Sequence, residues 1–210
     1  MIKVVVFDNG RGGEIIGNYI EDELPVEVIK VIDRNRGAYK NMKAKEVCER
    51  IEMNVKEYIG RARVIVLASP DVSLVAKKYL KTKYPNQQFV GYGDGLEDMI
   101  KKVKRAIILT SKQTRKTYEY QKMLPKEYGG ELVEMNFVNW NQSVKRKIKE
   151  FGYGTVILYS TEAISNKEIV QNAMGWRVDV VDLRKILLND ICTALNMVGK
   201  DGLRPRQRLS

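Results

Sequence analysis

The amino-acid sequence predicts an α/β protein with two similar lobes, each a doubly wound, mainly parallel four-stranded sheet flanked by helices. Three observations support this prediction. Short Val- and Ile-rich runs that end in turn residues recur along the chain. Between them lie segments whose apolar residues are spaced by three and four, which is typical of helices. Strands that alternate with helices form parallel sheets, and the alternation starts again near residues 101–105.

In the first half of the chain, each expected strand is a β-branched run that ends at Gly, Pro, Asn or Asp. The four expected strands are 3–10, 26–33, 63–70 and 88–95. The expected helices are 14–24, 43–60, 71–84 and 96–104. In the second half, the expected strands are 105–114, 131–137, 155–161 and 177–183, and a last helix covers 184–197. The tail at 199–210 has several arginines and almost no apolar anchor, so we expect it to be mobile.

Composition excludes several classes of function. The chain has 210 residues, 44% of them hydrophobic, which is enough to bury a core. It has two cysteines and no histidine, which argues against a disulfide framework, most zinc sites and every histidine-based triad. We therefore expect no metal and no cofactor. With no apolar run of membrane-spanning length and no signal-type segment, we expect a cytoplasmic protein without a membrane partner.

The net charge of +11 favours anionic partners, whether nucleic acid, phosphate or carboxylate. Basic runs at 101–105 and 145–149 and the basic tail are candidate contacts for nucleic acid. Such runs are most often solvated helix faces, and a basic tail is more often only a solubilising end. No aromatic residues are interleaved with them, so a base-stacking surface is not indicated.

In parallel sheets, ligands bind beyond the carboxyl ends of the strands, so the residues after each run are the candidates. Asp8, Asn9 and the glycine-rich GRGG turn come just after the first Val-rich run, and Ser69 and Asp71 come just after the third Val- and Ile-rich run. The turn lacks the lysine and the spacing of a nucleotide-binding phosphate loop. Its backbone amides are suited to a carboxylate or a small phosphate, and the alternative is a plain tight turn.

These segments resemble a known family. The run FDNGRGG at 7–13 is similar to the FDSGxGG opening of the glutamate racemases, in the aspartate/glutamate racemase superfamily. The segment 33–47 resembles that family's DTxRxPYGxKSxEEI segment, and 178–195 resembles its closing strand and helix. The resemblance implies that the last helix returns to the first lobe. The expected lobes are then 1–100 plus 184–210, and 101–183, and a homodimer is expected.

The chain departs from the family at the two cysteines that exchange the substrate's α-proton. The family's VIACNTAS stretch corresponds to VIVLASPD at 64–71, which places Leu67 at the first cysteine. The second cysteine, in ILGCTHYP, corresponds to Ser160. Leucine has no proton to exchange and an unassisted serine is a poor base, so the sequence argues against racemisation by this mechanism. Cys48 and Cys192 lie within expected helices, where a buried, inert thiol is the simplest interpretation.

The resemblance implies a set of ligand-binding residues even without the cysteines. The counterparts in this chain are Asp8, Asn9, Tyr39, Ser69, Thr114 and Thr161. Our first hypothesis is a non-racemising protein that binds a small anionic ligand, such as an acidic amino acid or a dicarboxylate, in the cleft between the lobes. The alternative for these residues is that they only cap helices and complete turns.

Two further hypotheses remain open. One is a divergent enzyme that acts on an anionic small molecule through carboxylate or hydroxyl groups, with Asp71 and Glu162 as the second-choice acid and base. The other is a module that binds nucleic acid or protein through its basic surface.

Overall fold

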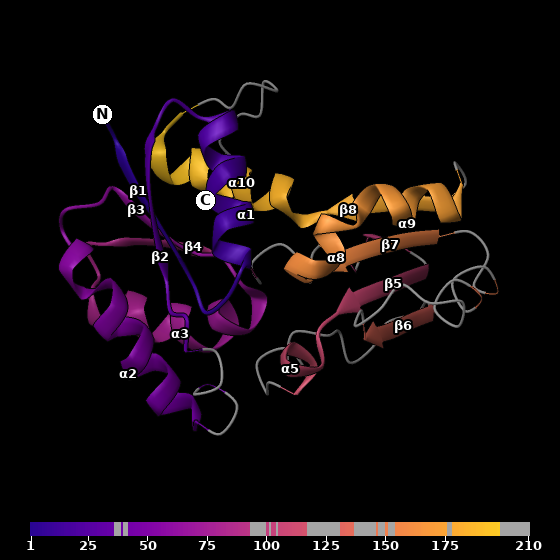
Figure 1. The fold of residues 1–210 in the computed structure, drawn as a ribbon, viewed down its shortest axis with the longest axis horizontal. Helices are drawn as coiled ribbons and strands as arrows, with labels where there is room; N and C mark the ends of the chain where they lie inside the picture. Colours follow the sequence, from indigo (N-terminus) through magenta and orange to yellow (C-terminus); the bar gives the residue numbers. More distant parts are fainter. Residues whose placement is uncertain are drawn as a thin grey trace. The chain divides into compact units, whose positions relative to one another are not determined.

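The computed structural model describes residues 1–35, 39, 42–92, 100, 102–103, 105–116, 131–136, 146, 150, 154–175 and 178–197. The chain forms two compact units, one made of Met1–Tyr92 with Arg184–Ser210 and the other of Gly93–Leu183. Each unit is built on its own four-stranded sheet (Figure 1).

The sheet of the first unit is entirely parallel, with the strand order β2-β1-β3-β4. Its strands are β1 (Lys3–Asp8), β2 (Glu27–Ile32), β3 (Val64–Leu67) and β4 (Gln88–Gly91). Strands β1 and β3 lie at the centre, and Phe7 pairs with Leu67 in their register. The residues that follow these two strands, Asp8 and Ala68 onward, therefore emerge side by side at the carboxyl edge.

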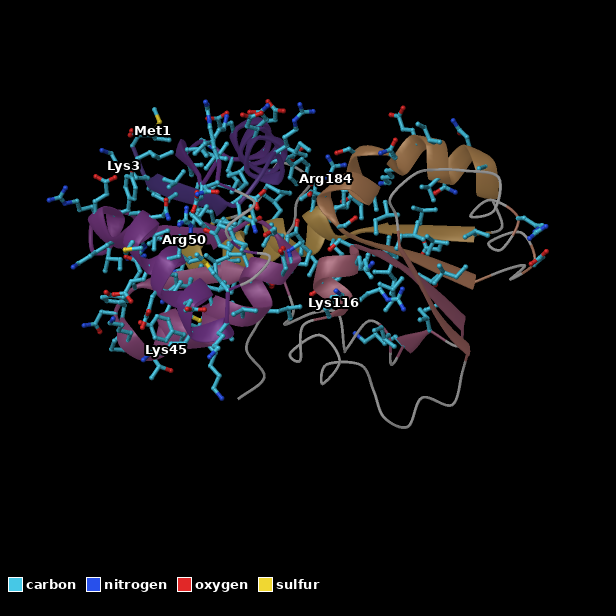
Figure 2. The ribbon with its side chains drawn as sticks, turned by 60° about the horizontal axis from the view of Figure 1, so that its bottom comes forward. Met1, Lys3, Lys45, Arg50, Lys116 and Arg184 are labelled. Carbon is cyan, nitrogen blue, oxygen red and sulfur yellow. The ribbon has the colours of Figure 1, made fainter. Side chains whose placement is uncertain are left out.

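Helices cover both faces of this sheet. They are α1 (Gly12–Glu23), α2 (Ala44–Val55), the short 3₁₀ helix η2 (Lys56–Tyr58), α3 (Pro70–Lys83) and α10 (Leu183–Leu195). Alternate strand residues, among them Phe7 and Leu67, pack into one hydrophobic cluster with α2 and α3. Helix α10 lies beside α1 in Figure 1, and the Arg184 guanidinium lies 5.0 Å from the centre of the Tyr19 ring (Figure 2).

The second unit repeats this topology. Its strands are β5 (Arg105–Thr110), β6 (Glu131–Asn136), β7 (Gly154–Tyr159) and β8 (Val178–Asp182), all parallel in the order β6-β5-β7-β8. Its described helices are α5 (Lys112–Arg115), α8 (Thr161–Ser165) and α9 (Lys167–Met174). Val156, Leu158, Ala163 and Val170 belong to one core that joins β7 to α8 and α9.

The predicted fold class is confirmed, with differences at element ends. The expected helix 43–60 ends at Val55, where the chain tightens into η2. The expected strand 105–114 stops at Thr110, because Ser111 opens α5 with its hydroxyl accepting from the Thr114 N–H at 3.0 Å. Most of the expected helix 96–104 and the whole tail 199–210 lie outside the described residues. Within the part of the chain that is described, no helix is both long and apolar enough to span a membrane.

Candidate functional site

Asp8 occupies the carboxyl end of β1, at the centre of the first sheet. Its backbone carbonyl accepts a hydrogen bond from the Asp33 N–H at 2.9 Å, and the preceding carbonyl of Phe7 accepts from the Ala68 N–H at 2.8 Å. The backbone at Asp8 is therefore fixed by hydrogen bonds from the residues that directly follow β2 and β3. Only 2% of Asp8 is exposed to solvent.

The glycine-rich turn serves the Asp8 carboxylate itself. The Asn9 N–H donates to Asp8 Oδ1 at 2.7 Å, and the Gly13 N–H lies close enough to the same carboxylate to favour its charged form. Gly13 is required for this approach, because a Cβ atom there would lie 2.9 Å from the Asp8 Cβ. The Asn9 amide, next to the turn, is thus occupied by a side chain of the protein, and of the turn's own amides that of Gly13 faces the same carboxylate.

Burial, and after it the nearby carboxylate of Asp71, raise the pKa of Asp8, which reaches about 7. The Asn9 N–H, the Ser69 hydroxyl and the Gly13 N–H act in the opposite direction, because they stabilise the charged form. The outcome is a carboxyl group that is partly protonated at neutral pH. Such a group can donate or accept a proton without histidine or cysteine.

Ser69 and Asp71 reach this edge from the start of α3. Ser69 is the N-cap residue of α3, but its side chain makes no capping hydrogen bond. Only 6% of Ser69 is exposed, and its hydroxyl approaches the Asp8 carboxylate without the alignment of a full hydrogen bond. Asp71 lies in the first turn of α3 and is half-buried. A buried hydroxyl and two carboxylates therefore share this edge with Asn9, which is 7% exposed.

Tyr39 belongs to a different cluster. Its hydroxyl donates to Asp33 Oδ2 at 2.9 Å, and the Arg50 guanidinium, labelled in Figure 2, donates to both oxygens of Asp33. Asn54 of α2 approaches the same carboxylate at 3.5 Å. The hydrogen bonds from Arg50 keep the pKa of Asp33 below its usual value, whereas burial and the bond to Asp33 raise the pKa of Tyr39. Tyr39 is thus engaged in fixing the segment after β2.

The sequence analysis missed Arg50 and Asn54. A usable signal exists, since they are four residues apart on one helix face and the helix follows a strand that ends in an aspartate.

The candidate residues of the second unit lie at the carboxyl ends of β5 and β7, which are paired strands. The Thr114 hydroxyl is buried and lies 2.8 Å from the Ser111 hydroxyl. Thr161, half-buried, is the first residue of α8. Between them, the Thr110 hydroxyl is fully buried and has no hydrogen-bond partner among the described residues. Glu162 is in α8, and its side chain lies outside the described part of the structure.

Leu67 and Ser160, which the sequence resemblance aligns with the racemase cysteines, are both engaged in the fold. Leu67 is fully buried and packs in the hydrophobic cluster with α2 and α3. The Ser160 hydroxyl caps α8, accepting from the Ala163 N–H at 3.1 Å. Cys48 and Cys192 are both buried in helices, as the sequence predicted, and neither forms a disulfide.

A surface hollow and a metal centre are two other kinds of candidate site. A hollow of about 260 Å³ lies in the first unit beside Lys83–Gln87, Ile59 and Gly60. These residues precede β4, so the hollow is at the amino end of that strand and is separate from the Asp8 site. Among the described residues, no group of three histidine, cysteine, aspartate or glutamate side chains is placed to hold a metal ion.

Comparison with solved structures identifies the architecture. Glutamate racemase from Thermus thermophilus, solved with β-chloro-D-alanine, superposes with a TM-score of 0.71 over 98% of this chain and 84% of its own, at 15% identity. The chain has the glutamate racemase fold. Escherichia coli glutamate racemase, solved with L-glutamate and the activator UDP-MurNAc-Ala, gives 0.71 at 15% identity, over 93% of this chain and 82% of its own.

The racemase fold extends to shorter proteins of the superfamily. An aspartate racemase homologue from Pyrococcus horikoshii gives a TM-score of 0.63 at 19% identity, covering 93% of this chain and all of its own. No protein-family model and no curated protein matches the amino-acid sequence. The racemase fold is therefore shared at low sequence identity.

Proposed function

We propose that this protein binds a small anionic ligand, an acidic amino acid or a dicarboxylate, without racemising it. The observation that carries the proposal is the polar, buried edge formed by Asp8, Asn9 and Ser69 beside a fully buried Leu67. By the resemblance, Asn9 replaces the family's serine and Ser69 its threonine, so this edge stays polar, while Leu67 replaces the first proton-exchanging group by a hydrocarbon. The hydroxyls of Thr114 and Thr161 remain predicted ligand contacts of the second unit.

The first experiment is a thermal-shift screen with D- and L-glutamate, D- and L-aspartate, glutarate, succinate, phosphate and nucleotides. A ligand at about a hundredfold its Kd adds roughly 2.7 kcal/mol to the free energy of unfolding, which raises Tm by roughly 5–10 °C for a chain of this size. We expect a shift with an acidic amino acid or a dicarboxylate. Asp8→Ala should abolish it and Cys192→Ser should retain it, each judged against its own Tm; equal effects of the two changes would refute the site.

A second candidate function is a divergent enzyme that uses carboxylates, and the pKa of about 7 at Asp8 favours it. The two functions are separated by incubating the bound amino acid with the protein in D₂O. A binder leaves the α-proton in place, whereas an enzyme exchanges it for deuterium in a reaction that Asp8→Asn stops. Optical rotation of the same sample reports racemisation directly.

Three further predictions concern the setting of this function. We propose a cytoplasmic location from the scarcity of cysteine, and a homodimer from the resemblance to the racemases. Binding of nucleic acid through the basic surface and tail is tested by retention on heparin at rising salt, compared with a chain cut after Val198. Retention that does not change with salt would exclude it.

A further inference from the structure

The hollow in the first unit lies where two connections meet, the one from η2 to β3 and the one from α3 to β4. Ile59 and Gly60 line it from the first connection, and Lys83–Gln87 line it from the second. Its volume of about 260 Å³ is below the roughly 300–1,000 Å³ of sites that enclose a whole small molecule. The hollow therefore suits one ring-shaped part of a larger partner.

The walls of the hollow are fixed by the protein itself. Gln87 is only 7% exposed, and its side chain accepts from the Gly60 N–H at 2.9 Å and donates to the Ala62 carbonyl at 3.2 Å. Gly60 has a φ of +76°, which favours glycine, and a Cβ atom there would meet nothing within 4 Å. One connection thus holds the other, and the backbone at Gly60 borders open space.

The aromatic residue of the wall is held by α2. The Glu52 carboxylate accepts from the Tyr84 hydroxyl at 2.5 Å, from the Tyr79 hydroxyl at 2.6 Å and from the Lys83 ammonium group at 2.8 Å. The Lys83 ammonium group also lies 6.0 Å from the centre of the Tyr84 ring. Tyr84 is half-buried and already ordered, so a partner that binds against it loses little free energy in ordering it.

Positive charge is in excess on both connections. Residues 52–63 and 79–88 carry two carboxylates, Glu52 and Glu57, and five cationic side chains, Lys56, Arg61, Arg63, Lys81 and Lys83. Glu52 is paired with Lys83, and the other four cationic residues are exposed, with Glu57 as the carboxylate that remains against them. A chain that crosses the hollow therefore meets cations on both sides of it. This charge is complementary to a polyanion.

We propose that this edge binds single-stranded nucleic acid, with one base in the hollow beside Tyr84 and the flanking phosphates on Arg61 and Lys81. Aromatic side chains stack on any base, and lysine and arginine bind the phosphates. An acidic peptide matches the charge, but its carboxylate side chains do not fill the hollow, whereas each nucleotide carries a ring and an anion together.

This site is independent of the proposed small-ligand site. The hollow lies at the amino end of the parallel sheet, whereas Asp8 lies at the carboxyl end. It is also distinct from the basic runs and the tail that the sequence offered to nucleic acid. The aromatic residue and the cations of this edge come from two connections about 20 residues apart in sequence, so no single run contains them.

The proposal is tested by fluorescence anisotropy with the full chain and two labelled probes of about 12 units, a length that such proteins cover. One probe is oligothymidylate, and the other is an abasic oligonucleotide with the same phosphates and no bases. We expect the wild type to bind oligothymidylate about fivefold or more tightly than the abasic probe, because stacking of one base on an aromatic side chain has an effect of that size.

Tyr84→Leu tests the place of the base. It should lower the affinity for oligothymidylate to that for the abasic probe and leave the salt dependence unchanged. Tyr79→Phe is the matched control, because it also removes a tyrosine hydroxyl from Glu52 but changes no residue that lines the hollow. It should bind both probes like the wild type.

Arg61→Gln and Lys81→Gln test the phosphate contacts. Each should weaken both probes severalfold and lower the slope of log affinity against log salt by about 0.7, the effect of one phosphate contact with a single strand. Lys45→Gln is the control of equal charge. Lys45, labelled in Figure 2, is exposed at the other end of α2, so this variant should keep the wild-type affinity and slope.

Four results would overturn the proposal. The first is equal affinity of the wild type for the two probes, or no binding of either at low salt. The second is an equal loss in Tyr79→Phe and Tyr84→Leu, and the third an equal loss in Lys45→Gln and Arg61→Gln, which would reduce the effect to net charge. The fourth is binding of an oligoglutamate peptide with the affinity of oligothymidylate and the same loss in Tyr84→Leu, which would assign the edge to an acidic protein.

Discussion

Asp8 is a carboxyl group that the fold keeps in an unfavourable place. Taking a carboxylate out of water favours its neutral form, and two backbone N–H donors offset only part of that cost. Asp33, one strand away, shows the opposite result because Arg50 and Tyr39 satisfy its charge. The contrast supports the proposal that Asp8 serves binding or chemistry, whereas the bonds to Asp33 give it a structural role.

The free energy of unfolding should therefore fall as pH rises from about 4 to about 7. In this window unfolded chains release the Asp8 proton while the folded state keeps it, so the unfolded state is favoured by up to about 4 kcal/mol in total. Asp33 has a lowered pKa, so its contribution is lost only when pH falls below the usual aspartate range. The chain has no histidine, so no histidine titration contributes to the change in stability between pH 5 and 7. Urea unfolding at pH 5, 6, 7 and 8 measures the slope.

Asp8→Asn removes the ionisable group and should flatten this dependence, while Asp71→Asn should only reduce it. Asp179→Asn is the control for the loss of one acidic group and should keep the wild-type slope. A slope that persists in Asp8→Asn would assign the pH dependence to another residue.

The Asp33 cluster gives a second prediction at this scale. Asp33→Ala leaves the Tyr39 hydroxyl, Arg50 and Asn54 without their shared acceptor, so it should cost about 2–4 kcal/mol of stability. Because Tyr39 is engaged there, Tyr39→Phe should lower stability by about 1 kcal/mol and leave ligand affinity within twofold. Chemical denaturation and the ligand titration measure the two effects. A large loss of affinity in Tyr39→Phe would restore Tyr39 to the binding site.

At the scale of single elements, the close packing of α1 against Asp8 explains the glycines at the start of this helix. Gly12 and Gly13 open the helix so that its first amides reach the carboxylate at the end of β1. Gly17, one turn further, is equally buried, but a Cβ atom there meets only the flexible side chain of Lys30. Two glycines of one helix therefore serve different purposes, and substitution by alanine distinguishes them.

Gly13→Ala should destabilise the protein by about 1–3 kcal/mol, because its Cβ would lie 2.9 Å from the Asp8 Cβ and helix and strand must separate. The same variant should lose ligand binding. Gly17→Ala is the matched comparison. Its Cβ would meet the Lys30 side chain, which must shift and loosen its bonds to Asn18 and Glu21, but alanine favours the helix by about 1 kcal/mol, so the loss of stability should be smaller than in Gly13→Ala. Urea unfolding ranks the two. Equal losses would mean that the contact with Asp8 is not what requires glycine at 13.

The elements of this fold are predictable from the sequence because their signal is local. β-Branched runs and three-and-four spacing placed all eight strands, and the residues after β1 and β3 marked the half of the site around Asp8. The Asp33–Arg50 pair was not predicted, because it joins residues 17 apart through tertiary packing. The protonation of Asp8 was also beyond the sequence, since burial and the approach of Asp71 arise only when α3 packs beside β1.

At the scale of the whole molecule, the first unit is completed by α10, which follows the last strand of the second unit. Residues from Arg184 onward belong to the first unit although they follow the last strand of the second. Leu187, Leu188 and Ile191 of α10 are buried, and Arg184 stacks on Tyr19 of α1. The return of this helix was expected from the resemblance to the racemases, and the four-strand repeat itself was evident from periodicity. The stability of the first unit therefore depends on α10, the helix at the C-terminal end of the described chain.

This organisation predicts that a cavity in α10 loosens the first unit rather than the second. Ile191 is fully buried, so Ile191→Ala should cost about 2–4 kcal/mol and raise amide hydrogen exchange in β1 to β4. Val170→Ala in α9, also fully buried, is the counterpart and should raise exchange in β5, β7 and β8. Exchange measured by mass spectrometry on peptides from each strand gives the comparison. If both variants loosened all strands alike, the two units would unfold as one cooperative body, and the division at residues 92 and 184 would have no energetic counterpart.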